Sequence, residues 1–191
     1  MAKVTIWYKS VMNKTEFTKR CIADALFELM KVKDISDISV KEIVNKAGFS
    51  RMSYYRNFKS YEETLHYFLD MKTSDFQKKK GFDYEFNNAL DAIDRFAIIL
   101  ADEDRREIDD VFVRQNLQHI IFDNTHRFIV KTSPKDRLFV DLFITGGLNE
   151  IWYTWVKRGH KESVEEIISY LKSQVISDAK KILIELNEKQ E

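Results

Sequence analysis

The sequence predicts an all-α protein in which a small N-terminal domain of three helices precedes a larger helical domain. One proline and five glycines in 191 residues leave few places for turns. Apolar residues recur at three- and four-residue spacings rather than alternately, which indicates helices. Capping boxes, in which a cap oxygen and a third-position carboxylate satisfy each other's backbone amides, mark helix starts along the chain. The four pairs are Asn13 with Glu16, Ser39 with Glu42, Ser60 with Glu63, and Ser163 with Glu166.

These patterns predict eight helices. Gly48 ends the second helix, Pro134 opens the seventh in its first turn, and Gly159 closes the seventh. The predicted ranges are 14–31, 40–47, 51–57, 61–79, 84–101, 105–130, 135–158 and 164–187. Residues 1–12 are expected to form a basic arm. We place the domain boundary after residue 60, so that residues 61–191 form the C-terminal helical domain.

Charge is distributed unevenly although the net charge is zero. Residues 1–61 contain twelve Lys and Arg against six Asp and Glu, and the remainder contains 19 against 25. A basic N-terminal part followed by an acidic remainder is typical of a phosphate-binding module joined to a module that does not bind phosphate.

Several classes of function are not expected from this sequence. Cys21 is the only cysteine, which excludes an intrachain disulfide and fits a reducing compartment. Without a secretory signal or a membrane-length apolar run, we expect a cytoplasmic protein with no membrane contact. No phosphate loop or nucleophile motif is visible, so we expect neither an enzyme nor a cofactor. His119, Asp123 and His126 share a helical face that permits a metal site, but nothing completes it, and we interpret them as surface or polar-core residues.

Two short helices lie within residues 39–58. Helices of two turns are marginal alone, so they must pack on a neighbour. The first helix presents one apolar face, Gly48 supplies a left-handed turn, and Phe49 and Phe58 close the core against the helix at 14–31. This is a helix-turn-helix arrangement. The residues expected in its core are Val40, Ile43, Val44 and Ala47, with Phe17, Ile22, Ala25, Leu26 and Leu29 from the longer helix.

The second short helix is mostly polar, which indicates a nucleic-acid surface. A helix fits the major groove of DNA, where Arg pairs with guanine and Asn with adenine, while hydroxyls and Lys hold phosphates. The alternative is that these side chains are only solvated. The predicted DNA-binding residues are Lys41, Ser50, Arg51, Met52, Ser53, Tyr55, Arg56, Asn57 and Lys59.

A longer run carries a family resemblance. It extends from Ile43 to Leu65 and reads Ile-Val-Asn-Lys-Ala-Gly-Phe-Ser-Arg-Met-Ser-Tyr-Tyr-Arg-Asn-Phe-Lys-Ser-Tyr-Glu-Glu-Thr-Leu. The Ala-Gly turn, the Ser and Tyr positions, the Phe and the acidic stretch ending in Leu resemble the signature of TetR/AcrR transcriptional regulators. Residues 38–43 match as well. The chain departs from the family at Tyr61, where Lys is usual, although Lys59 is near enough to reach the same phosphate.

The resemblance implies a DNA-binding domain, a dimerising C-terminal domain and loss of operator affinity when an effector binds. It implies phosphate contacts from Ser53 and Tyr55 and places Lys41 at the groove margin. The residues it places at base edges are Arg51, Met52, Tyr55 and Asn57. We therefore expect a repressor that binds double-stranded DNA as a homodimer. The alternative is a protein-binding co-regulator of the same fold without sequence-specific DNA binding, for which Tyr61 is the only support.

The two last predicted helices carry long apolar stripes. In the final helix the stripe is Val164, Ile168, Leu171, Val175, Ala179, Ile182 and Leu186. Two glycines in the helix at 135–158 permit close helix approach. Together the helices at 135–158 and 164–187 suggest a four-helix dimer interface, with a pseudo-palindromic DNA site as the consequence of two-fold symmetry. The alternative is that both stripes serve the core of one chain.

Aromatic residues are frequent between residues 86 and 155, and they permit a small-molecule pocket between helices. Residues 145–163 also resemble a C-terminal domain found in part of the same family. The alternative is that the aromatics fill a solid core. The candidate pocket residues are Phe96, Phe122, Phe143, Trp152 and Trp155.

Overall fold

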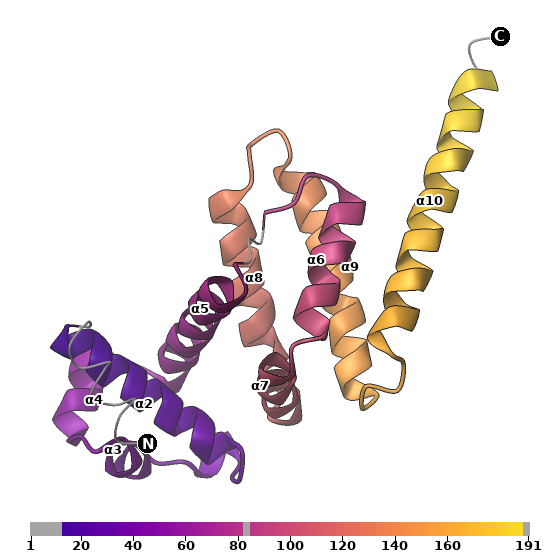
Figure 1. The fold of residues 1–191 in the computed structure, drawn as a ribbon. Helices are drawn as coiled ribbons and strands as arrows, with labels where there is room; N and C mark the ends of the chain where they lie inside the picture. The colour runs from indigo at the N-terminus through magenta and orange to yellow at the C-terminus, as the bar shows by residue number, and fades with distance from the viewer. Residues whose placement is uncertain (1–12, 82–84, 189–191) are drawn as a thin grey trace. The chain divides into compact units, whose positions relative to one another are not determined.

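The computed structural model describes residues 13–81 and 85–188, and over these ranges the chain is all-α, without a strand (Figure 1). The expected basic arm at residues 1–12 lies outside the described residues. The helices are α2 (Lys14–Met30), η1 (Ile35–Asp37, a 3-10 turn), α3 (Val40–Ala47), α4 (Arg51–Asn57), α5 (Tyr61–Lys80), α6 (Ala89–Leu100), α7 (Glu103–Arg114), α8 (Gln118–Thr132), α9 (Leu138–Lys157) and α10 (Val164–Glu188).

All four predicted cap residues are confirmed, but among the described residues only two of the four predicted capping boxes are reciprocal, and the Glu63 carboxylate accepts from the Lys59 amide instead of the Ser60 amide. Asn13, Ser39, Ser60 and Ser163 each accept a hydrogen bond from the backbone amide three residues later. At Ser39 and Ser163 the glutamate also accepts from the cap amide, which completes a reciprocal box. Local hydrogen bonds of this kind depend on a few adjacent residues, which is why the sequence alone located these helix starts.

The helices form two compact units. The first comprises Met1–Phe82 and Arg114–Asn124, and the second comprises Asp83–Val113 and Thr125–Glu191. The predicted boundary after residue 60 falls between α4 and α5, whereas the first unit also includes α5 and the start of α8. The physical reason is that α5 buries Leu65, Phe68 and Leu69, so it completes the core on which α2 packs.

In the first unit, α2 packs against α3, α4 and α5. Ile43 and Val44 of α3 are buried, as expected, and Gly48 adopts the predicted left-handed conformation with φ of 76°. Phe58 is buried, while Phe49 lies edge-on to Phe17 with ring centroids 6.5 Å apart. The turn and these contacts fix the orientation of α4.

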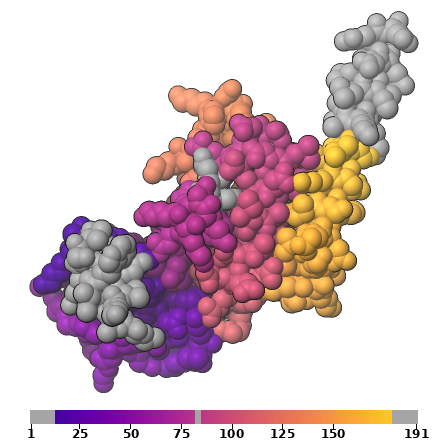
Figure 2. Space-filling view, in the orientation of Figure 1, coloured from indigo at the N-terminus to yellow at the C-terminus, as the bar shows by residue number. Residues whose placement is uncertain are grey.

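In the second unit, α6 packs against both α9 and α10, and the surfaces of α6 and α10 adjoin in the space-filling view (Figure 2). A buried polar cluster joins α7 to α9. Asp109 accepts from the Arg105 guanidinium at 2.8 Å and from the Trp152 indole nitrogen at 2.7 Å. Burial raises the pKa of Asp109, and the charge of Arg105 opposes that effect.

Three predicted helix bounds were wrong. The helix expected over 105–130 is two helices, α7 and α8, because Asn116 adopts a left-handed conformation with φ of 57°. Asparagine tolerates that conformation better than most residues. The helix expected over 84–101 begins at Ala89 after an Asn88 cap, and the helix expected over 135–158 begins at Leu138, later than Pro134 suggested.

No helix among the described residues combines the length and the apolar character needed to span a membrane.

Candidate functional site

The short helix α4 is held in place by one of its seven residues. Tyr54 is the only residue of α4 that is buried, with 1% of its surface exposed. Its ring packs against Phe58 and Tyr61, and its hydroxyl lies 3.2 Å from the Thr64 hydroxyl on α5. The sequence prediction did not assign Tyr54 a role. Its four-residue spacing from Phe58 was the available signal.

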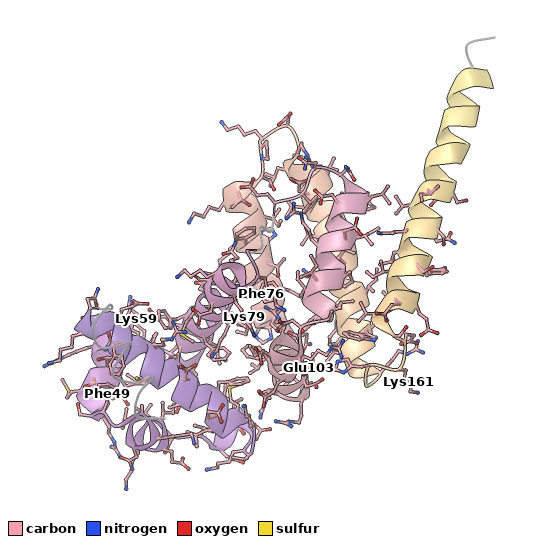
Figure 3. The ribbon with its side chains drawn as sticks, viewed as in Figure 1. Phe49, Lys59, Phe76, Lys79, Glu103 and Lys161 are labelled. Atoms are coloured by element: carbon pink, nitrogen blue, oxygen red, sulfur yellow. The ribbon has the colours of Figure 1, made fainter. Side chains whose placement is uncertain are left out.

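The rest of α4 faces solvent. Met52 and Tyr55 are 61% and 60% exposed, and Arg51 and Arg56 are also exposed. Neither arginine has a carboxylate partner in the part of the chain that the structure describes. The predicted DNA-binding residues outside α4 are exposed too: Lys41 on α3, and Ser50 and Lys59, which flank α4 in the sequence. Figure 3 labels Phe49, which precedes α4 in the sequence, and Lys59, which follows it.

The shorter polar side chains of α4 have partners within the helix. Ser50 caps α4 by accepting from the Ser53 amide at 3.2 Å, and the two hydroxyl oxygens are 3.0 Å apart. The Asn57 amide nitrogen donates to the Ser53 carbonyl at 2.7 Å. Ser53 and Asn57 are accordingly half-buried. These groups stabilise the ends of α4 and are less available to an external partner than the arginines are.

Tyr61, the position at which the chain departs from the TetR/AcrR signature, has a structural contact. Its hydroxyl donates to the Ile38 carbonyl at 2.7 Å, and its ring lies edge-on to Tyr54. Burial raises the pKa of Tyr61. The phenol therefore joins the first turn of α5 to the segment before α3 and supports the ring that anchors α4.

The break between α7 and α8 also supports the first unit. The Gln115 amide nitrogen donates to the carbonyls of Met30 and Lys33 at 2.9 and 2.7 Å, and its oxygen accepts from the Ile35 amide at 3.0 Å. Arg114 donates to the Met30 carbonyl at 3.1 Å. These bonds, termed here the Gln115 latch, satisfy backbone groups at the end of α2 and in the connection to α3. The sequence prediction missed them, because it ran one helix through this position.

Electrostatic contacts also fix the start of α3. The Glu42 carboxylate accepts from the Lys33 ammonium at 2.6 Å and from the Ser39 amide at 2.9 Å. The Lys33 hydrogen bond, followed by those of Ser39, lowers the pKa of Glu42 to about 2. Glu42 is thus ionised at neutral pH and compensates one lysine, while Lys41 and Lys46 on the same helix stay exposed.

The five candidate pocket residues do not form one group. Phe96, Trp152 and Trp155 are buried in the second unit. Phe122 is half-buried and belongs to the first unit, and Phe143 is 83% exposed on α9. A pocket lined by all five is therefore not present in a single unit.

The first unit has an open depression of about 320 Å³, which is lined mainly by apolar surface from η1, α5 and the start of α8. Its lining includes Tyr61, Leu65 and His119. No group of three or more metal-binding side chains occurs among the described residues. Asp123 shares a predicted helical face with His119 and His126, but its carboxylate Oδ2 lies 3.5 Å from the imidazole Nε2 of His66 on α5.

Comparison with known protein families and with curated proteins finds no match to this chain.

Proposed function

We propose that this chain is a DNA-binding transcriptional regulator of the TetR type, in which α3 and α4 form a helix-turn-helix and α4 enters the major groove. In this proposal the chain binds a pseudo-palindromic operator as a homodimer and acts as a repressor. A small-molecule effector releases it from DNA.

One observation carries the DNA-binding proposal. A two-turn helix is anchored by a single buried tyrosine, and it presents two arginines that have no carboxylate partner among the described residues, beside an exposed phenol and thioether. Uncompensated cations on a narrow protruding helix provide both the phosphate affinity and the shape that groove binding requires. The excess of basic residues before residue 62 supports the same conclusion.

The direct test is fluorescence anisotropy with duplex DNA flanking the chain's own gene, measured across salt concentrations. We expect sequence-specific binding with a steep salt dependence. Arg51→Ala and Tyr55→Ala should each weaken binding about tenfold or more, because each removes a groove contact. Lys78→Ala, which removes an exposed cation from the last turn of α5, is the matched control and should bind like the wild type.

Thermal denaturation of the same variants separates folding from binding. Arg51 and Tyr55 are exposed, so both variants should unfold near the wild-type temperature. Unfolding of either variant would contradict the assignment of α4. Absence of binding to any duplex would favour the co-regulator alternative.

The homodimer is supported by an exposed apolar face in the second unit. Phe139 and Phe143 on α9 are each 83% exposed, lie one turn apart and are followed by exposed Gly146 and Gly147. Tyr170 on α10 is exposed as well. Two adjacent exposed phenylalanines are unfavourable in water, and small residues permit close helix approach, so we propose that the same face of a second copy covers them.

Sedimentation equilibrium tests the dimer. The wild type should have twice the chain mass, and the double variant Phe139→Glu/Phe143→Glu should be monomeric, because it buries charge without a partner. Val32→Glu, a charge added at an exposed apolar position of the first unit, should stay dimeric. A monomeric wild type, or a double variant that still dimerises, would contradict the proposed interface.

The proposal that a small-molecule effector binds this chain is based on the family resemblance alone. Three of the five predicted pocket residues are buried in one unit and are the ones proposed to contact an effector: Phe96, Trp152 and Trp155 of the second unit. Screening small molecules for release of the protein from its duplex tests it. A ligand contacting either tryptophan should also change the intrinsic fluorescence.

A further inference from the structure

Met52 differs in chemistry from every other exposed residue of α4. It is 61% exposed, yet its thioether donates no hydrogen bond and is only a weak acceptor. It lies three residues before Tyr55, which places the two side chains on the same side of the helix. Such a side chain distinguishes one partner from another almost entirely through apolar contact.

The neighbouring polar groups leave room for apolar recognition. Asn57 donates to the Ser53 carbonyl, and the Ser53 hydroxyl lies against that of Ser50, so the short polar side chains have partners within α4. Arg51 and Arg56 are long cations that suit phosphate and guanine. None of these groups recognises an apolar feature of a base.

In the major groove the apolar feature of a base pair is the C5-methyl group of thymine. We propose that Met52 contacts the C5-methyl of a thymine in each half-site and thereby determines specificity at that position. This inference rests on the proposed function, since it requires α4 to lie in the major groove. It adds the identity of one base and the chemical group that is recognised.

Replacement of thymine by deoxyuridine tests the proposal, because deoxyuridine pairs identically and lacks only the methyl group. The probe is the duplex that full-length protein enriches from a randomised library, with each thymine replaced in turn. Burial of one methyl group contributes ~0.8 kcal/mol, so we expect about fourfold weaker binding by the wild type at one thymine in each half-site.

Variants link that loss to Met52. Met52→Ala should bind the thymine and deoxyuridine duplexes equally, whereas Met52→Leu, which keeps an apolar side chain of similar volume, should retain the discrimination. Val32→Ala, which shortens another exposed apolar side chain of the same unit, should behave like the wild type.

Two results would overturn the inference while leaving the proposed function intact. One is a wild type that is insensitive to every thymine replacement, and the other is a sensitivity that persists unchanged in Met52→Ala. A protein that enriches no duplex at all would overturn the proposed function and this inference together.

Discussion

The Gln115 latch should contribute measurably to the stability of the first unit. Gln115→Ala removes three hydrogen bonds, to the carbonyls of Met30 and Lys33 and from the amide of Ile35. Each such bond contributes about 1 kcal/mol net. The side chain is half-buried and water replaces part of the loss, so we expect the free energy of unfolding to fall by ~2 kcal/mol.

Gln115→Glu makes the same test sharper, since it preserves size and changes only one atom of the terminal group. The amide nitrogen that donates to two carbonyls becomes an oxygen, so an anion faces the Met30 and Lys33 carbonyls. We expect a loss of ~3 kcal/mol at neutral pH. Protonation of the glutamate restores one donor, and the loss should therefore diminish as the pH falls.

Urea denaturation followed by circular dichroism measures both effects. Gln174→Ala, which removes an exposed glutamine from α10, is the control and should change stability by less than about 0.5 kcal/mol. A Gln115→Ala variant as stable as this control, or a Gln115→Glu variant no less stable than Gln115→Ala, would contradict the stabilising role of the Gln115 hydrogen bonds.

Three further predictions concern single contacts. Tyr54→Phe should lower the free energy of unfolding by ~1 kcal/mol, measured in urea, because the Thr64 hydroxyl loses a buried partner. Trp152→Phe should lower the free energy of unfolding by ~2 kcal/mol in the same assay, because the buried Asp109 carboxylate loses one of its hydrogen-bond donors. The pKa of Glu42 is lowered from 4.5 to about 2, so its contribution to stability should be complete above pH 4.5 and be lost as the pH falls toward 2. Urea midpoints across that range should therefore decline more steeply in the wild type than in Glu42→Gln.

Local hydrogen bonding explains which parts of the fold could be predicted. The caps at Ser39 and Ser163 and the turn at Gly48 each depend on residues adjacent in sequence, and the structure has them where the sequence indicated. The exposed residues of α4 could be predicted for a similar reason. A helix too short to bury much must expose most of its polar side chains.

Distant contacts explain what could not be predicted. The break at Asn116 interrupts an apolar pattern that is otherwise continuous, and the residue before it is held by backbone groups some eighty positions earlier in the chain. The exposed position of Phe143 is a second example. Periodicity identifies an apolar face, but it does not say whether that face is covered by the same chain or by another.

The architecture of α4 separates the residues needed for folding from those proposed for binding. Orientation of the helix depends on Tyr54, on the turn at Gly48 and on the flanking Phe49 and Phe58, because the other six residues of α4 are not buried. Replacing Arg51, Met52, Tyr55 and Arg56 together by alanine should therefore leave stability within about 1 kcal/mol of the wild type, since alanine has the highest helix propensity.

The same quadruple variant should lose specific DNA binding completely, and paired measurements of urea denaturation and fluorescence anisotropy would record both outcomes. A variant that unfolds would show that the exposed face contributes to the core, contrary to the anchoring by Tyr54. A variant that folds and still binds the enriched duplex would place the recognition surface on another element. Stability retained with binding lost is the combination expected if the single buried tyrosine orients α4 and the exposed side chains alone contact DNA.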